Sequence, residues 1–491
     1  MKLLLSLQLL VVAVSALTAR APTVANDLKA LVSAPSSVAI NLRVRWSTFN
    51  APILAIIVNV TTESDVAAVV KYCTSRSIPF TAQNGGNGWG KTFNLGNNGV
   101  LINLAGLNAV TSSKSKTQAT ISGGVVIGEA IQAANAAGVV VQTGKCNFVG
   151  ALGAILGGGY GMSSLSLVST STPDSCSSSN LMGEVGFGVD NVLSLRVVVA
   201  SGEVLTVSST SHSDLFWALR GDGPNFGVVT SATVRAWPTS AHDRTAWLMN
   251  LFFSPEKLPQ IAQAIQDLPL KPEQVVYLIL TNSGPPSNAP AVLVTGFLRK
   301  GTEEAGRAAF APLYALGPIS NSSNVAAYES WNAANDNFCA RGDRKPAFST
   351  TIKHMQPETW PAIWDLYTEF QAKGPSSAVL IERYNLTRAQ SAPKGSAALQ
   401  EELRRAAFAQ AIVIPWYTDA ALDAEAQYSG RRIRDIWSYS VTATESPTYV
   451  NFAHGDETAE AIYGSRMSSL RKSKRKWDPA GAFNQWFNVG T

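Results

Sequence analysis

Apolar positions along the chain repeat with the periods of helices and strands, and they predict where the regular elements lie. Val66, Val69, Val70 and Cys73 are spaced as i, i+3, i+4 and i+7, which predicts the buried face of a helix capped by Thr62. This position favours a core residue or half of a disulfide for Cys73 over a reactive thiol. The other elements predicted in the first 240 residues are strands over 78–82, 100–104, 118–122, 139–143, 193–199, 204–207 and 227–234 and helices over 129–137 and 214–219.

The pattern changes at about residue 241, where strands begin to alternate with amphipathic helices. The strands are predicted over 247–253, 275–281, 291–298, 348–353 and 378–384, and the helices over 255–268, 301–313, 358–372 and 397–408. This alternation predicts an antiparallel sheet with helices on one face, and hence an α+β fold. The last segment carries different motifs and is expected to return to the first domain. The predicted domains are therefore 20–240, 241–445 and 446–491.

Composition excludes several classes of protein. Of 491 residues, 46% are apolar and only 15% are charged, which is the opposite of the balance found in disordered chains. The net charge is +5, and the dense basic cluster consists of Arg471, Lys472, Lys474, Arg475 and Lys476. Such a run on a helix is typical of a solvated face. We therefore expect no nucleic-acid partner.

The N-terminus predicts secretion. Lys2 is followed by an apolar run of about 12 residues and then by small residues, which is the pattern of a signal peptide over 1–19. The alternative is a membrane anchor, but a spanning helix needs about 20 apolar residues. Three glycosylation sequons, which begin at Asn59, Asn321 and Asn385, agree with an extracellular protein. We expect a soluble secreted protein with no membrane association.

Cysteine and histidine usage argues against a metal site. The four cysteines form no C-x-x-C motif and are too few for a disulfide scaffold, while the four histidines lie far apart in the sequence. We therefore predict no metal.

Three glycine-rich segments lie in the first half, over 83–90, 144–161 and 221–227. Glycine lets backbone N–H groups approach a polyanion closely. None of the three segments fits the G-x-G-x-x-G spacing of a Rossmann dinucleotide site. Each alone is compatible with an ordinary turn, but together they favour a cofactor that carries phosphate.

The order of these segments resembles a known family. Together with Val189-Asp190-Asn191 and Asn225-Phe226-Gly227-Val228-Val229-Thr230, they are similar to the p-cresol methylhydroxylase type of FAD-binding domain. Tyr449-Val450-Asn451-Phe452 and Trp477-Asp478-Pro479 look like the tail of berberine-bridge-like enzymes. The resemblance covers nearly the whole mature chain. It implies a two-lobed flavoenzyme in which the lobe that binds FAD is split across the chain.

The resemblance also assigns residues to the cofactor. A histidine that bonds to the flavin in many relatives is replaced by Asn87, whereas the second attachment residue is matched by Cys146. The resemblance therefore implies a single 6-S-cysteinyl link through Cys146, and the alternative is non-covalent FAD beside a free thiol. Val149 has a small side chain at the position that gates oxygen access in the family, and in this respect it resembles members that react with oxygen. The expected cofactor-binding residues are Gln83, Asn84, Gly85, Gly86, Asn87, Gly88, Cys146, Val149, Gly150, Gly153, Leu156, Gly157, Gly158, Gly159, Gly161, Asp190, Asn191, Gly227, Val228 and Val229.

The implied reaction is hydride transfer from a small molecule to the flavin, assisted by a base that takes a proton. Candidates for this site are Tyr449, Asn451, Tyr417 and Glu382, while Phe452 replaces a tyrosine of the family motif. The leading hypothesis is a secreted oxidase of an alcohol, a sugar or a specialised metabolite that passes electrons to O2. A dehydrogenase with another acceptor and a redox-silent flavoprotein, for example a cyclase, are the alternatives.

One segment departs from the family pattern. Residues 162–180 form a Ser/Thr-rich stretch between the glycine-rich region and the next motif. It is either a retained intron in the gene sequence or a genuine surface insertion.

Overall fold

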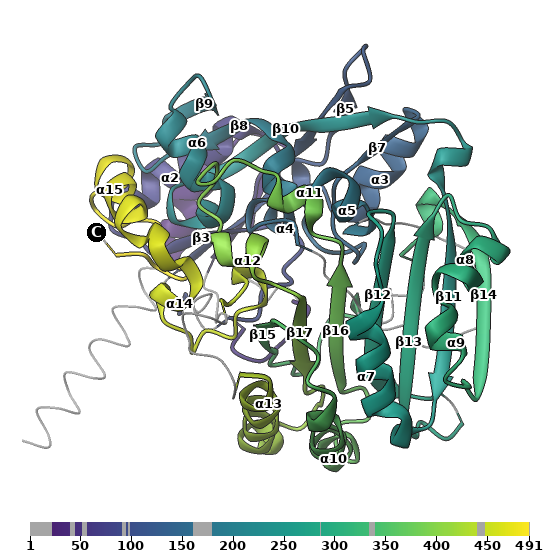
Figure 1. Cartoon of the computed structure of the whole chain (residues 1–491). Helices are drawn as coiled ribbons and strands as arrows, with labels where there is room; N and C mark the ends of the chain where they lie inside the picture. The colour runs from purple at the N-terminus through teal and green to yellow at the C-terminus, as the bar shows by residue number, and fades with distance from the viewer. Residues whose placement is uncertain are drawn as a thin grey trace, which may run out of the picture.

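The protein is represented by a computed structural model that describes residues 22–39, 45–51, 56–90, 95–96, 99–160, 179–284, 286–332, 339–438 and 447–490. The predicted signal peptide, Gly161 and nearly all of the suspected insertion lie outside these residues. Within the described part of the chain, no helix combines the length and the apolar character needed to cross a membrane. The described strands form three sheets, of four, six and seven strands (Figure 1).

The four-stranded sheet has the order β1 (Ser37–Ala39), β2 (Ile56–Asn59), β4 (Val100–Asn103) and β3 (Phe80–Gln83), and β2 and β3 both run parallel to β4. Helix α2 (Glu63–Ser75) connects β2 to β3. Its N-cap is Thr62, whose hydroxyl accepts from the backbone N–H of Asp65 at 3.1 Å. The predicted apolar face of α2, including Cys73, is fully buried. The predicted helix, its cap and the core position of Cys73 are therefore confirmed.

The six-stranded sheet is built around one long strand, β10 (Val228–Pro238). It pairs antiparallel with β6 (Gln118–Ser122), β7 (Val139–Val141) and β8 (Val192–Val198), and β5 (Val110–Ser112) and β9 (Val204–Ser208) complete the sheet. Helices α3 (Ile127–Ala136), α4 (Ala151–Leu156) and α6 (Ser213–Asp222) pack with this sheet to form the first lobe.

The seven-stranded sheet forms the second lobe. Its order is β14 (Ser320–Ala327), β11 (Thr245–Phe253), β13 (Pro290–Arg299), β12 (Gln274–Asn282), β16 (Ala378–Tyr384), β17 (Ala409–Ile414) and β15 (Phe348–Ile352), and every pair is antiparallel. Helices α7 (Leu258–Asp267), α10 (Trp360–Gln371) and α13 (Asp423–Ser438) cover one face (Figure 1). The other face turns toward the first lobe. The predicted antiparallel sheet with helices on one face is confirmed, and so is the α+β two-lobed fold.

Five described strands, β1, β2, β5, β14 and β17, and the long helix α13 were not predicted, and one predicted helix is shorter. Strand β14 is polar because it lies at the sheet edge, where few side chains reach the core. The helix expected over 397–408 is confined to α12 (Glu401–Arg405), and its last residues lead into β17. Helix α13 has a polar sequence with a narrow buried stripe, so its pattern is weak.

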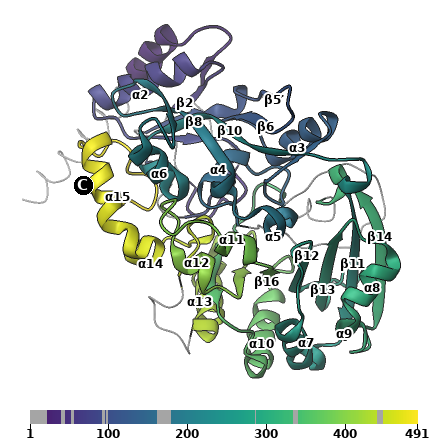
Figure 2. The same ribbon diagram turned by 45° about the horizontal axis from the view of Figure 1, so that its top comes forward.

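The C-terminal segment returns to the first lobe, where α15 (Met467–Trp477) lies beside α6 (Figure 2). The expectation that the basic cluster of α15 is a solvated face is wrong for Lys474, which is fully buried. Its ammonium group donates to Asp478 Oδ2 at 2.7 Å and to the carbonyls of Asn225 at 2.7 Å and Phe483 at 2.6 Å. Lys474 therefore anchors the tail to the first lobe.

Candidate functional site

A cavity of about 240 Å³ lies between the first lobe and the C-terminal segment. A water molecule needs only about 15 Å³ of such volume, so the cavity accommodates a ligand of many atoms. Its walls are the three glycine-rich segments and the tail. The lining residues include Arg45, Phe80, Gln83, Asn84, Gly85, Gly86, Asn87, Gly88, Trp89, Val149, Gly150, Gly153, Leu156, Gly157, Gly223, Gly227, Val228, Val229, Asn451, Gln485 and Trp486.

Two buried hydrogen-bond donors of the cavity wall have no acceptor in the part of the chain that the structure describes. The Oε1 atom of Gln83 accepts from the Arg45 guanidinium group, which also donates to the carbonyl of Gly88 at 2.7 Å. The buried Nε2 of Gln83 and Nε1 of Trp89 have no acceptor among the described residues. A buried donor without a partner costs roughly 1–3 kcal/mol, so such groups usually meet a ligand or water. The wall therefore suits a ligand rich in acceptors, as the pyrophosphate and the carbonyl groups of FAD are.

Two glycines of the second segment adjoin the cavity in different ways. Gly153 lies on α4, and a Cβ atom built there would meet no atom within 4 Å, so this face of the helix is open to the cavity. At Gly157 a Cβ atom would lie 2.1 Å from Oδ1 of Asn451, so a side chain is excluded by the tail. The residues present therefore fit FAD, with Gly153 leaving space for the ligand and Gly157 letting the tail close.

Asn451 of the tail lines the cavity, and Tyr449 lies beside it. The Nδ2 atom of Asn451 donates to the carbonyl of Ala154 at 3.1 Å and to the hydroxyl of Tyr449 at 2.9 Å. The same hydroxyl accepts from the backbone N–H of Tyr160 at 3.2 Å. Burial raises the pKa of Tyr449 well above its ordinary value. In this state Tyr449 is a neutral hydroxyl that ties α4 to the tail rather than a ready base.

One row of paired residues is polar on every strand of the seven-stranded sheet. The cross-strand partners in this row are Ser322, Asn250, Thr295, Tyr277, Glu382, Gln410 and Thr351. Paired residues share a face, and Tyr277 belongs to the core that faces the first lobe. The inner part of this polar row, from Tyr277 to Thr351, is buried, whereas Asn250 and Thr295 are half-buried. The polar row thus leads from the partly open side of the sheet to Glu382.

Aromatic hydroxyls surround Glu382 at the junction of the lobes. Oε2 of Glu382 accepts from the hydroxyl of Tyr384 at 3.3 Å, and that hydroxyl lies 3.0 Å from the hydroxyl of Tyr277. The ring of Tyr160 packs edge-on against that of Tyr384, with centroids 5.4 Å apart. The buried hydroxyl of Tyr160 and Oε1 of Gln410 have no hydrogen-bond partner among the described residues. These groups are available to a polar substrate.

Lys145 enters the same junction from the first lobe, and the sequence analysis missed it. Its ammonium nitrogen lies 3.7 Å from the ring centroid of Tyr277 and 5.9 Å from that of Tyr384. Burial lowers the pKa of Lys145, and the charge of Glu382 acts in the opposite direction. No local pattern indicated a site at this residue, because its partners lie more than 130 positions away along the chain.

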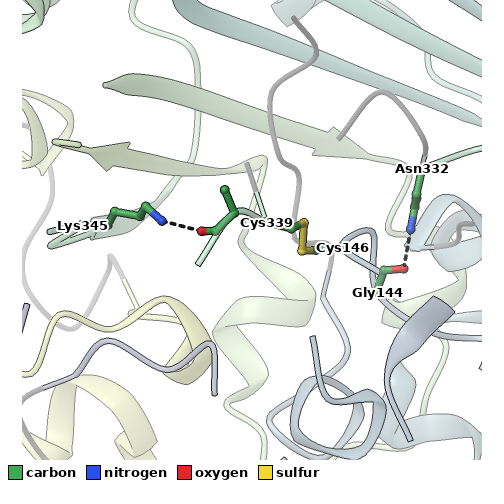
Figure 3. The surroundings of a disulfide bond; sticks show 6 residues. Gly144, Cys146, Asn332, Cys339 and Lys345 are labelled. Atoms are coloured by element: carbon green, nitrogen blue, oxygen red, sulfur yellow. Dashed lines mark hydrogen bonds between the residues drawn. A yellow bond between two sulfur atoms is a disulfide. The ribbon is translucent and has the colours of Figure 1, made fainter. Parts of the chain in front are cut away.

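Cys146 is bonded to Cys339 in the structure (Figure 3). This disulfide joins the loop after β7 to the segment before β15, with Asn332 donating to the carbonyl of Gly144 on one side. One sulfur cannot hold both a disulfide and a flavin thioether. The predicted thioether is therefore incompatible with the state seen here, because the Cys146 thiol that it requires is already used.

Asn87 lies beside the loop that carries Cys146. With its amide oriented to satisfy both groups, its nitrogen donates to the carbonyls of Gly85 at 3.1 Å and Phe148 at 3.3 Å. The residue that replaces the family's histidine therefore links the first glycine-rich segment to the second through hydrogen bonds.

Several predicted residues lie apart from the cavity and the Glu382 cluster. The hydroxyl of Tyr417 donates to Asp423 at 2.7 Å, and its ring packs on Phe370 in a separate small core. Asp190 forms a bidentate pair with Arg404 at 2.6 Å. These contacts assign supporting roles to Tyr417 and Asp190.

Three further residues predicted to bind the cofactor, Asn191, Gly158 and Gly159, do not line the cavity. The amide of Asn191 donates to the carbonyls of Val185 and Phe187, which again supports the first lobe. Gly158 and Gly159 pack against Tyr449 and Gly188 rather than lining the cavity. Arg45 and Trp486 line the cavity but belong to no glycine-rich segment, so composition offered no signal for them. Among the described residues, no group of three or more metal-ligating side chains is present.

Comparisons with known proteins agree with this architecture. Residues 54–208 match the model of an FAD binding domain, and residues 448–489 match the model of the berberine and berberine-like family. The chain is 31% identical over 455 residues to the FAD-linked oxidoreductase hasG of Aspergillus fumigatus. The aligned region covers 89% of this chain and 92% of that protein.

Solved structures share the fold. A carbohydrate oxidase from Microdochium nivale superposes with a TM-score of 0.78 at 18% identity and covers 94% of this chain and 99% of its own. A glucooligosaccharide oxidase from Acremonium strictum superposes with a TM-score of 0.75 at 17% identity and covers 91% of this chain and 94% of its own.

Three observations agree: the first lobe is split across the chain, the tail closes a cavity lined with donors, and one relative matches nearly the whole chain. The chain belongs to the berberine-bridge-like FAD-linked oxidoreductases with a p-cresol methylhydroxylase type FAD-binding domain.

Proposed function

We propose that the protein is a secreted oxidase that takes a hydride from a small hydroxyl-bearing molecule and passes the electrons to O2, forming H2O2. The observation that carries this proposal is the buried carboxyl group of Glu382, set in a polar row and facing the lobe that holds the cofactor cavity. FAD, when bound, accepts two electrons and a proton equivalent as hydride. The chain itself supplies the cavity, the orientation of the substrate and a group that accepts the substrate's hydroxyl proton.

Glu382 is the best-placed proton acceptor of the four predicted candidates. It lies on a rigid central strand, and Tyr384 donates to one of its oxygens. Tyr449 donates nothing to this carboxylate in the described contacts, and Tyr417 is engaged with Asp423. A positioned carboxylate that removes the hydroxyl proton while hydride leaves contributes roughly 10²–10⁴-fold to such a reaction.

An uncharged substrate with several hydroxyl groups suits the polar row. Thr295 and Asn250 offer hydrogen-bonding groups on the more open side, and Tyr277 offers an aromatic face next to Glu382. The names of the structural neighbours, a carbohydrate oxidase and a glucooligosaccharide oxidase, agree with this substrate class. An aromatic alcohol of specialised metabolism would use the same aromatic faces.

A covalent bond between Cys146 and the flavin is part of the proposal for a state in which the disulfide to Cys339 is open. The glucooligosaccharide oxidase named above carries a 6-S-cysteinyl, 8α-N1-histidyl FAD. Asn87 excludes the histidyl bond here. Retention of flavin colour in acid-precipitated protein, and loss of that colour in Cys146→Ser, would support the cysteinyl bond. Colour that stays in the supernatant would contradict it.

The central experiment uses the secreted full chain. Visible flavin absorbance is expected in the purified protein, and a panel of alcohols and sugars is then scanned for H2O2 release. Glu382→Gln should lower kcat/KM by about 10²-fold or more, whereas the exposed Glu304→Gln serves as the matched control and should not. Turnover with dye acceptors but not O2 would favour a dehydrogenase. Bound flavin with no reduction by any substrate would favour the redox-silent alternative, and protein without flavin would overturn the proposal.

A further inference from the structure

The two edge strands of the seven-stranded sheet have different surroundings. Strand β15 is buried along its whole length, and the hydroxyls of Ser349 and Thr351 donate to the carbonyls of Phe452 at 2.9 Å and Pro447 at 2.5 Å. The C-terminal segment therefore covers that edge. Strand β14 forms the opposite edge and lies at the outer margin of the molecule (Figures 1 and 2). Every residue of β14 except Ala326 is exposed or half-buried, and β11 is its one partner among the described strands.

Strand β14 has none of the sequence features that usually keep a sheet edge from pairing with another chain. Such edges typically carry charged residues, a proline or a bulge. Residues Ser320–Ala327 include neither a charged residue nor a proline, and their register with β11 is continuous. Two large apolar side chains are strongly exposed here, Ile319 at 73% and Val325 at 55%. The edge is thus regular, uncharged and partly apolar, and such edges associate readily.

A glycosylation sequon lies in the middle of this edge. Asn321 is exposed, and it begins the sequon Asn321-Ser322-Ser323. Residues spaced by two share a face of a strand, so Asn321 and Val325 lie on one face, and Ile319 precedes Asn321 by two residues. At about 3.4 Å per residue, Asn321 lies about 7 Å from Ile319 and about 14 Å from Val325 along the strand. A bulky group on Asn321 would therefore extend over both exposed apolar side chains.

The contacts of Asn321 are compatible with a glycan, which is attached to the amide nitrogen. The amide oxygen accepts from the guanidinium group of Arg307 at 3.5 Å. The other two sequons differ, because the amide nitrogens of Asn59 and Asn385 donate to a serine hydroxyl at 3.1 Å and to a backbone carbonyl at 2.8 Å. Of the three sequons, that of Asn321 is therefore the one best placed for modification of the folded chain.

We propose that an N-linked glycan on Asn321 covers the open edge of β14 and prevents this edge from pairing with β14 of a second copy of the chain. The inference rests on the secretion that is part of the proposed function, because N-glycans mark secreted proteins. In the modification, the amide nitrogen loses a proton and bonds to the anomeric carbon of an oligosaccharide, whose lipid diphosphate carrier leaves. The attached glycan is bulky and hydrophilic.

The geometry of strand pairing explains how the glycan would act. A second strand must approach to within about 4.8 Å of β14 to form backbone hydrogen bonds, and a sugar chain rooted in the middle of the edge occupies that space. Without it, two copies of β14 would pair antiparallel about a two-fold axis, where the same surface meets itself. The expected product is a dimer in which the two sheets are continuous.

The first experiment uses the full chain, secreted from a host that attaches N-glycans. The glycan is located by mass spectrometry of the peptide that contains Asn321. Sedimentation velocity over a series of concentrations then compares the wild type with Asn321→Gln. The weight-average mass of the wild type should not depend on concentration, whereas that of Asn321→Gln should rise up to twofold. A wild type without a glycan on Asn321, or a variant whose mass does not change with concentration, would overturn the proposal.

Two variants of Ser323 and one of Val325 test the cause of the association. Ser323→Ala removes the same sequon by another change and should associate as Asn321→Gln does, whereas Ser323→Thr keeps the sequon and is the matched control. Addition of Val325→Lys to Asn321→Gln places a charge on the edge and should restore the lower mass. Association of Ser323→Thr, or a failure of Val325→Lys to reverse association, would show that another surface or the substitution itself is responsible, and the proposal would be wrong.

Two measurements do not depend on the folding of a variant or on its yield. Trimming the glycans of the folded wild type to the innermost sugar should raise its tendency to associate, and an unchanged mass would count against the proposal. Hydrogen exchange of the peptide over 319–327 should slow in the associated form, because its backbone N–H groups would then be paired. Slower exchange at other surfaces, with none at this edge, would also refute the pairing.

The outcomes separate this inference from the oxidase proposal. Asn321 does not line the cavity, so Asn321→Gln should keep its flavin absorbance and its turnover per chain. If substrates are oxidised and Asn321→Gln does not associate, the oxidase proposal stands and the role of the glycan is refuted. If the edge associates without its glycan but no substrate is oxidised, the reverse holds. A chain that is active but neither secreted nor glycosylated would refute both secretion and this inference.

Discussion

Replacement of Gly153 by alanine should have opposite effects on the flavin-free protein and on cofactor binding. Gly153 lies within α4, and the new methyl group would meet no protein atom within 4 Å. Alanine in a helix is favoured over glycine by about 0.5–1 kcal/mol, so the free energy of unfolding of the flavin-free protein should rise by about that amount. The methyl group projects into the cavity that we assign to FAD.

The cost to binding follows from overpacking. Inserting a methyl group into a filled site typically costs about 1–3 kcal/mol, and 1.4 kcal/mol is a tenfold change in Kd. FAD affinity should therefore weaken by roughly 5- to 150-fold. The assay is titration of flavin-free protein with FAD, followed by quenching of flavin fluorescence, together with urea unfolding of the same samples.

Gly157→Ala is the matched control, because its methyl group would collide with Asn451 and should destabilise the flavin-free protein itself. A Gly153→Ala variant that binds FAD as tightly as the wild type would refute the assignment of the cavity. So would a variant that is less stable than the wild type without flavin, because the open space beside Gly153 would then not exist.

Two further predictions concern glycosylation and pH. Asn321 lies exposed on edge strand β14, whereas the amide of Asn59 donates to Ser37 and that of Asn385 donates to the carbonyl of Leu270. Asn321→Gln should therefore remove most of the mass that a glycosidase releases, and an unchanged mass would contradict this. Burial raises the pKa of Asp222 to about 8, well above its value of about 4 in an unfolded chain. The stability that its proton provides is complete below about pH 4 and is lost as the pH rises through about 8. Asp222→Asn should thus gain stability relative to the wild type across this range in urea unfolding, and parallel pH curves would count against it.

Local patterns predicted the elements whose signals lie within a few residues. The apolar period of α2 and its Thr62 cap form a continuous signal, and so do the glycine-rich segments that line the cavity. Strand β14 escaped prediction because an edge strand has little core to face. Lys474 escaped because a charge run looks the same whether one member is buried or not.

Contacts between residues far apart in the sequence could not be predicted, as the residues around Glu382 show. Glu382 was a candidate because of its place in a strand, but nothing near Lys145 in the sequence indicates that it lies against the ring of Tyr277. That contact depends on the docking of two lobes, which is set by the summed packing of many residues. The disulfide of Cys146 could not be predicted for the same reason, because its partner Cys339 lies 193 residues away.

The cavity also has a consequence for biosynthesis. Its wall contains Arg45 from the beginning of the chain and Gln485 and Trp486 from its end, and the buried ammonium of Lys474 fastens that end in place. A ribosome adds these last residues only after every strand of both lobes has been made. A nascent chain that lacks these residues therefore has no complete pocket, and the cofactor site is finished only when this segment has docked. Removal of the segment that carries Gln485 and Trp486 would then produce a protein that folds much of its core yet binds no flavin.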